Sequence, residues 1–188
     1  MSIDRRAFIG SLAAAGGTSM LRPARLPAQP RSGRYSKPVI DAHFHWYPQE
    51  FIELMIKEGP ANGARISGPN ANGEYRAKVP GADHYAAEGS SFNRAKTDFD
   101  VIFKAMDERR VDMYALTMTH PHLNWAPPEF GLKLARAYND AASATHLKHP
   151  KRLLGTMLLP MQAPKLAVQE MERAAKLPGI RALNLLSP

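Results

Sequence analysis

The pattern of apolar and polar residues predicts alternating helices and strands through the second half of the chain. Apolar residues recur every three or four positions in the helical segments, and short apolar runs bounded by turn residues mark the strands. The predicted helices cover 98–110, 129–148 and 165–176, and the predicted strands cover 113–119, 153–160 and 180–186. Such alternation predicts parallel strands joined by right-handed helical crossovers.

Two of the predicted helices have an apolar face that should be buried. In the helix at 129–148 the residues on this face are Leu134, Ala135, Tyr138, Ala141, Ala142 and Thr145. In the helix at 165–176 we expect the inward residues to be Ala167, Val168, Met171, Ala174 and Ala175.

An additional strand is predicted at 37–46, and it carries two histidines on one face. Side chains alternate along a strand, so His43 and His45 point the same way, about 7 Å apart along the strand. Two imidazoles can bind one metal ion at roughly 2.0–2.1 Å each. Asp41 shares their face and could orient a ligand, and Trp46 at the strand end is a candidate for lining a substrate pocket. The alternative is a hydrogen-bonded histidine pair without metal.

Residues 47–97 interrupt the regular pattern with Gly, Pro and Asn turns. A short helix at 51–57 and a hairpin of 64–67 with 74–79 are the elements that we expect there. An irregular insertion of about fifty residues in a compact domain is usually functional or disordered. We expect a lid over the substrate, from which Arg76 could bind a carboxylate; an exposed charge is the alternative.

Charge is concentrated at the amino terminus. The chain has 188 residues and a net charge of +8, but residues 1–34 hold six arginines and one aspartate, and the remainder carries 19 basic and 16 acidic residues. No basic run with interleaved aromatic residues follows residue 34. This distribution argues against a nucleic-acid-binding protein.

Residues 1–34 resemble a bacterial twin-arginine export signal and linker. Arg5 and Arg6 precede a weakly apolar stretch at 11–21, and Ala28 offers a small residue for cleavage. That stretch is shorter than the membrane span of about 20 apolar residues, so no stable membrane anchor should remain after cleavage. We therefore expect a periplasmic protein; a disordered amino terminus is the alternative. The chain has no cysteine, so a transition metal must use His, Asp or Glu.

The order of elements fits an open doubly wound sheet or a (β/α) barrel. The first strand is not followed by a Gly-rich phosphate-binding fingerprint, which disfavours a nucleotide-binding sheet. Histidines at the carboxyl end of the first strand fit a barrel, because barrel active sites lie at that end.

Five motifs give the chain its resemblance to a known family. They lie at 40–45 (IDAHFH), 134–140 (LARAYND), 149–155 (HPKRLLG), 159–164 (LPMQAP) and 167–174 (AVQEMERA). Together they resemble the amidohydrolase-related family, in the metal-dependent branch of the aminocarboxymuconate-semialdehyde decarboxylase-like enzymes. The resemblance implies an α/β fold of the (β/α)₈ TIM-barrel type and one divalent ion, usually zinc, with His43 and His45 as ligands. It also implies hydrolysis or non-oxidative decarboxylation of a small carboxylated substrate.

The chain departs from this family pattern in length. A complete barrel takes about 250 residues, and the family draws further metal ligands and catalytic residues from the second half of the barrel. We expect a truncated barrel domain at 35–188 with the first four strands and no assignable catalytic residue. Its partner would be a second copy or a missing carboxyl-terminal half. The alternative function is an inactive half-barrel that binds a partner or a metal without turnover.

The loop after the second strand of this predicted barrel holds further candidates for the substrate pocket. His120, His122 and Trp125 lie there, on the side where barrel active sites form. Ordinary loop residues are the alternative interpretation.

Overall fold

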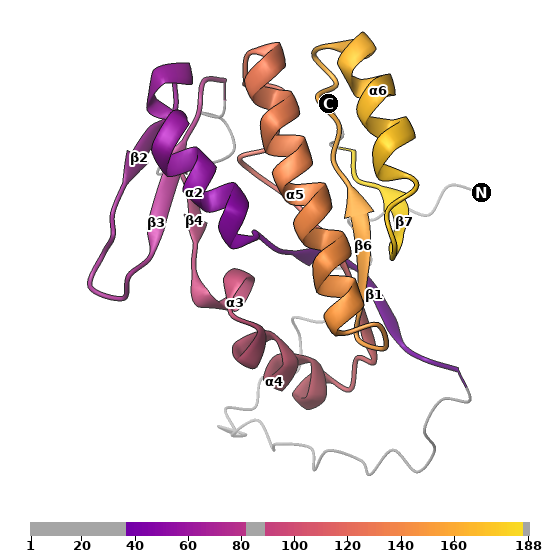
Figure 1. Cartoon of the computed structure of the whole chain (residues 1–188). Helices are drawn as coiled ribbons and strands as arrows, with labels where there is room; N and C mark the ends of the chain where they lie inside the picture. Colours follow the sequence, from indigo (N-terminus) through magenta and orange to yellow (C-terminus); the bar gives the residue numbers. More distant parts are fainter. Residues whose placement is uncertain (1–36, 82–88, 186–188) are drawn as a thin grey trace, which may run out of the picture. The chain divides into compact units, whose positions relative to one another are not determined.

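The computed structural model describes residues 37–81 and 89–185, and its largest feature is a parallel sheet (Figure 1). The predicted leader at 1–34 lies outside the described residues. The sheet has four strands in the order β1-β5-β6-β7. Their bounds are Ile40–His45 for β1, Met113–Thr117 for β5, Leu153–Met157 for β6 and Ile180–Leu183 for β7.

The strand order distinguishes between the two sheet architectures that the sequence allowed. All three pairings are parallel, and the spatial order repeats the chain order. A doubly wound sheet reverses direction at a switch point, whereas successive strands of a (β/α) barrel follow one another around the sheet. The described sheet therefore has the winding of a barrel, with β1 and β7 at its two edges.

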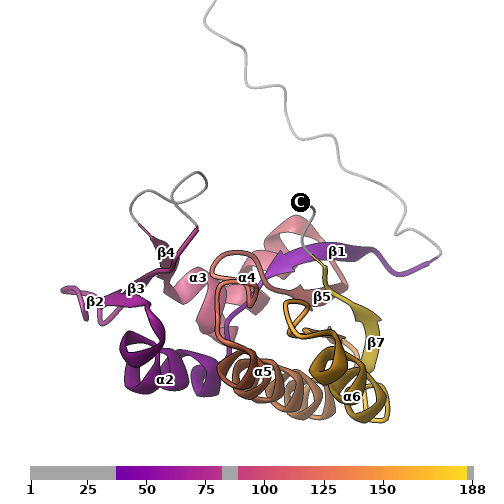
Figure 2. The ribbon, with the colours of Figure 1, turned by 90° about the horizontal axis from the view of Figure 1, so that it is seen from above.

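Two helices pack side by side on one face of this sheet (Figures 1 and 2). They are α5 (Pro128–Lys148) and α6 (Pro164–Ala174). The predicted stripe of α5 is confirmed, since all six of its residues are buried. The predicted face of α6 is wrong in part, because Val168 and Met171 are 52% and 39% exposed and Ala175 is exposed as well, whereas Glu170 is fully buried.

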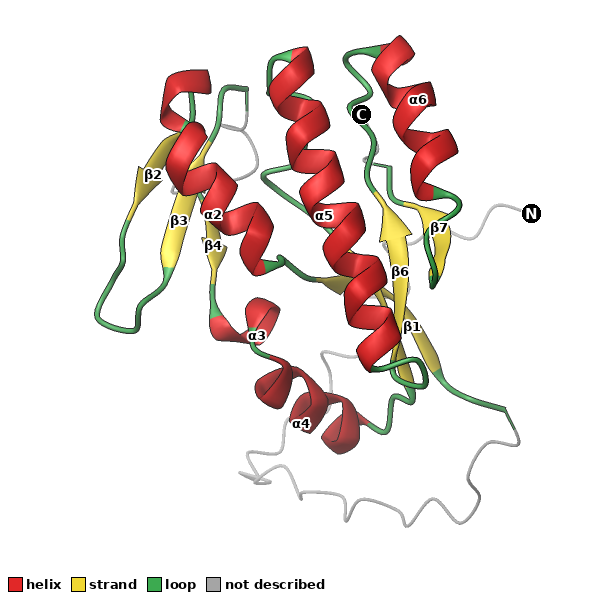
Figure 3. Ribbon diagram, in the orientation of Figure 1, coloured by secondary structure: helices red, strands yellow, loops and turns green. Residues whose placement is uncertain are grey.

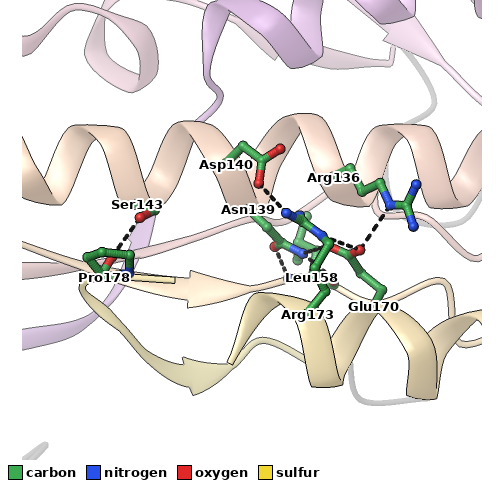
Figure 4. Close-up of polar contacts among 8 residues, drawn as sticks. All are labelled: Arg136, Asn139, Asp140, Ser143, Leu158, Glu170, Arg173 and Pro178. Carbon is green, nitrogen blue, oxygen red and sulfur yellow. Dashed lines mark hydrogen bonds and ion pairs between the residues drawn. The ribbon is translucent and has the colours of Figure 1, made fainter. Parts of the chain in front are cut away.

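A polar network explains why α6 turns a glutamate inward (Figure 4). Glu170 accepts hydrogen bonds from Nε (2.9 Å) and Nη2 (2.8 Å) of Arg173, from Nε of Arg136 (3.1 Å) and from Nδ2 of Asn139 (2.8 Å). Asn139 also pairs with the backbone N and O of Leu158, just after β6, at 2.7 and 3.0 Å. A buried carboxylate is tolerated when it is paired and hydrogen-bonded, and here it links α5, α6 and the sheet.

The segment at 47–97 is more regular than its turn-rich sequence suggests (Figure 3). Its elements are α2 (Gln49–Glu58), a 3₁₀ turn at Pro60–Asn62, β2 (Arg65–Ser67), β3 (Tyr75–Lys78), β4 (Ser90–Phe92) and α3 (Arg94–Thr97). The predicted hairpin is confirmed as antiparallel β2 and β3, and α2 extends the predicted short helix. The expectation of an irregular insertion was wrong, because β4 adds a third strand and its Phe92 joins the core.

The insertion and the parallel sheet share one hydrophobic core. Tyr47 packs edge-on against Phe92 at 4.9 Å between ring centroids, and Trp46 packs against Tyr138 at 5.5 Å. The helix α4 (Phe99–Arg109) follows, and the side chain of Asp98 caps it by accepting a hydrogen bond from the backbone N of Asp100 at 3.0 Å. None of the helices in the described part of the chain combines the length and apolar character needed to cross a membrane.

We predict that Glu170→Gln lowers the free energy of unfolding by about 2 kcal/mol, because two partly solvated guanidinium groups lose their carboxylate. Burial alone would raise the pKa of Glu170, but the hydrogen bonds from Arg173, Asn139 and Arg136 outweigh it and lower the pKa. The stabilisation is thus complete above the ordinary glutamate value of 4.5 and disappears as the pH falls below it.

Denaturant unfolding at a series of pH values measures this effect. The exposed neighbour Glu172 provides the matched control, Glu172→Gln, for which we expect little change. Equal stability of the wild type and Glu170→Gln at neutral pH would contradict the interpretation of the network.

Candidate functional site

The two histidines of β1 converge on a single point. The Nε2 atoms of His43 and His45 lie 2.8 Å apart, and their ring centroids are separated by 4.8 Å. Two nitrogens bound to one ion at roughly 2.0–2.1 Å, at right angles to each other, would lie about 2.9 Å apart. The pair therefore fits two neighbouring ligand positions of one metal ion, and a direct hydrogen bond between the imidazoles fits the same separation. The predicted common face is confirmed.

The environment of His45 favours its neutral form. The side chain is half-buried. Burial lowers its pKa first, and the positive charges of His43 and Lys96 lower it further. A histidine must be neutral to bind a metal, so this environment suits a ligand.

Asp41 acts on the backbone of the strand. Its Oδ1 accepts a hydrogen bond from the backbone N of His43 at 3.0 Å, where the pairing of β1 with β5 shifts register between Asp41 and Phe44. The sequence predicts that Asp41 could orient a ligand, and the contact found is with the backbone of the first histidine.

The remaining predicted site residues do not complete a cluster of metal ligands. Among the residues that the structure describes, no group of three or more His, Cys, Asp or Glu side chains could hold a metal ion. His43 and His45 therefore stand as a pair, and His120 and His122 do not join them as ligands. Trp46 is 2% exposed and belongs to the hydrophobic core.

The loop that follows β5 is held in place by two other segments of the chain and by one contact within the loop. The hydroxyl of Tyr47 donates to the carbonyl of His120, and Nε1 of Trp125 donates to the carbonyl of His122 at 2.6 Å. After β6, Nε2 of Gln162 donates to the carbonyls of Leu123 (2.9 Å) and Ala126 (2.8 Å). Because these contacts bind its backbone, the loop can present its histidines in a defined position.

His122 is buried, and neither of its ring nitrogens has a hydrogen-bond partner within the part of the chain that the structure describes. Its side chain is 3% exposed, and the nearby Asn124 side chain and Asn184 backbone do not reach it with hydrogen-bond geometry. Burial, with a smaller contribution from His120, lowers the pKa of His122 to about 4, so the ring is neutral at physiological pH. Unsatisfied buried polar groups are uncommon and often lie at functional positions.

Lys96 is a site residue that the sequence did not reveal. It lies in α3, and its backbone carbonyl accepts a hydrogen bond from the N of Tyr47 at 3.0 Å. Tyr47 follows His45 by two residues. Burial and then the charge of Arg76 lower the pKa of Lys96. No local motif marks this position, because its neighbours come from segments distant in sequence. Arg94, two residues before Lys96, is paired with Asp98 at 2.6 Å.

Sequence comparison assigns the chain that carries this histidine pair to a protein family. Residues 40–188, which include both histidines, match the Amidohydro_2 family, described as amidohydrolase. The chain belongs to the amidohydrolase family.

Two curated relatives of this amidohydrolase chain carry decarboxylase names. The 2-amino-3-carboxymuconate-6-semialdehyde decarboxylase of Dictyostelium discoideum is 28% identical over 76% of the chain and 39% of its own length. The gamma-resorcylate decarboxylase of Rhodococcus jostii is 33% identical over 39% of the chain and 23% of its own length. The amidohydrolase chain thus spans less than half the length of these relatives.

Solved structures show the same fold. The apo form of the Metarhizium anisopliae IDCase matches 79% of the chain and 42% of its own length, with a TM-score of 0.62 and 22% identity. A dihydroxybenzoic acid decarboxylase from a Polaromonas species, solved with manganese and the inhibitor 2-nitroresorcinol, matches 78% of the chain and 37% of its own length, with a TM-score of 0.51 and 25% identity. These likenesses agree with the barrel-type winding of the four-stranded sheet.

We predict that His45→Ala reduces the affinity of the chain for a divalent cation at least tenfold, because one of the two converging nitrogens is lost. Calorimetric titration with Mn²⁺ or Zn²⁺ and metal analysis after dialysis measure this. The matched control is His149→Ala, at the end of α5, where the ring packs against Phe99 and Phe103. Equal metal content in the two variants would contradict the assignment.

Proposed function

We propose that the chain carries the metal-binding first half of a non-oxidative decarboxylase that acts on a small carboxylated aromatic substrate. The observation that carries the proposal is the 2.8 Å convergence of the His43 and His45 Nε2 atoms at the carboxyl end of β1. In (β/α) barrels the reaction takes place at this end of the strands. The names of the curated relatives favour decarboxylation over hydrolysis, and the manganese-bound neighbour supports a divalent ion, with manganese or zinc as the choices.

In this proposal, different segments of the chain bind the metal, form a wall of the substrate site and cover the substrate. His43 and His45 would hold the ion through their Nε2 atoms. A bound divalent ion polarises a substrate oxygen or lowers the pKa of bound water. The loop after β5, fixed by Tyr47 and Gln162, would form one wall of the substrate site. The insertion at 47–97 would cover the substrate, with Arg76 directed at its carboxylate.

One observation favours the second candidate function, a half-barrel that holds metal without turnover. Catalytic zinc sites use three protein ligands and one open position. The described residues provide the histidine pair and no larger ligand group. A second copy or a carboxyl-terminal half would then have to complete the site.

Turnover by the purified chain distinguishes these two functions. We expect release of CO₂ from 2,6-dihydroxybenzoate in the presence of Mn²⁺ or Zn²⁺, and a loss of at least about a hundredfold in His43→Ala, since metal-assisted catalysis depends on the ion. Stoichiometric metal binding without CO₂ release would overturn the decarboxylase and support the metal-holding half-barrel. A chain that binds no metal would overturn both.

We also propose that residues 1–34 direct export by the twin-arginine route. Replacing Arg5 and Arg6 with lysine should retain the chain in the cytoplasm, because the export machinery reads the arginine pair. The matched control replaces Arg22 and Arg25 with lysine, which should leave export unchanged. Cell fractionation measures both, and equal periplasmic amounts of the two variants would contradict the proposal.

A further inference from the structure

The ammonium group of Lys96 contacts two segments of the chain, one of which continues directly from the strand of the histidine pair. Its Nζ lies 3.4 Å from the carbonyl O of Ser91 in β4 and 5.7 Å from the ring centroid of Tyr47, which follows the end of β1 by two residues. The backbone of Lys96 is fixed by the hydrogen bond from the N of Tyr47. The side chain is half-buried, so its charge has lost part of its hydration.

Among the described residues, the charged groups that act on Lys96 and His45 are positive. Arg76 lies opposite Ser91 in the pairing of β3 with β4, and its charge acts on Lys96. Lys96 in turn acts on His45, together with His43. Within the residues that the structure describes, no carboxylate forms an ion pair with Lys96. A partly desolvated cation without a counter-ion is unfavourable, and an anion bound there would relieve the cost.

A purely structural role for Lys96 does not explain why its ammonium group lies near other positive charges. The aliphatic stem of a lysine can cover an apolar surface while its ammonium group reaches water, and a cation above an aromatic ring gains about 0.5–1 kcal/mol at an exposed site. Neither effect requires the ammonium group to lie among other cations. The exposed Lys104 of α4 shows that this chain also places lysines freely in solvent.

We propose that Lys96, with Arg76 beside it, forms a subsite for the carboxylate of a small organic anion next to His43 and His45. This inference rests on the proposed function, because it assigns the recognition of the acidic substrate to a residue of the insertion. Lys96 donates to a carboxylate oxygen and so orients the substrate relative to the histidine pair. A neutral analogue of the same shape loses this interaction and binds weakly.

Binding of benzoate, compared with the neutral benzamide, tests the subsite without any need for turnover. Titration of the full chain by calorimetry or NMR should show that Lys96→Met raises the Kd for benzoate about tenfold, since one charge-assisted hydrogen bond is lost. Lys96→Arg should stay within about threefold of the wild type because the charge is kept. The matched control Lys104→Met should bind benzoate as the wild type does, and benzamide should bind all variants equally weakly.

Several outcomes would overturn the subsite. They are the absence of benzoate binding by the wild type, unchanged benzoate affinity in Lys96→Met, and an equal loss of affinity in Lys104→Met. Lys96→Gln, checked by thermal unfolding, replaces Lys96→Met if the latter does not fold. Failure of the proposed function is separable, because Lys96-dependent benzoate binding without CO₂ release leaves the subsite standing. Conversely, CO₂ release with an unchanged KM in Lys96→Met supports the decarboxylase and overturns the subsite.

Discussion

The parallel pairing of β1 with β5 is the constraint on which the candidate site depends. The backbone N of Trp46 donates to the carbonyl of Thr117 at 2.8 Å, and the Thr117 hydroxyl donates to the carbonyl of Phe44 at 3.0 Å. These bonds fix the end of β1, and the alternation of side chains then puts Trp46 into the core and His45 on the opposite face. The next residue, Tyr47, joins the end of β1 to the insertion, because its backbone N donates a hydrogen bond to the carbonyl of Lys96.

Three buried or half-buried polar side chains illustrate two different uses of polarity. Glu170 is fully buried, yet it accepts hydrogen bonds of 2.8 Å from Asn139 and Arg173, and through Asn139 it joins α5, α6 and the sheet. His122 and Lys96 lie beside the ends of the parallel strands and lack such satisfaction: the first has two unpaired ring nitrogens, and the second has no carboxylate partner among the described residues. Polar groups that are satisfied stabilise a fold, whereas unsatisfied ones indicate where a ligand is expected.

Family membership and a working metal centre require different evidence from the chain. Family membership follows from the match over residues 40–188, and the winding of the sheet agrees with it. A working metal centre requires more ligands than the converging pair of β1. The chain spans 39% of its Dictyostelium relative, so the activity of the whole enzyme and metal binding by the converging pair are both proposals for this chain.

Local periodicity was sufficient to predict much of this protein. The common face of His43 and His45 follows from the two-residue period of a strand, and the buried stripe of α5 follows from the helical period. Periodicity did not identify the inward face of α6, because Glu170 is buried by its partners Arg136 and Asn139 on α5, which only the fold brings near. The same reason applies to β4, whose Ser-Ser-Phe sequence becomes a strand through pairing with β3, and to Lys96. The sequence by itself determined the alternating strands and helices of the parallel sheet and that two histidines share a face. The tertiary structure decided which polar side chains are buried and which charges meet beside that pair, because those properties depend on contacts between residues far apart in the chain.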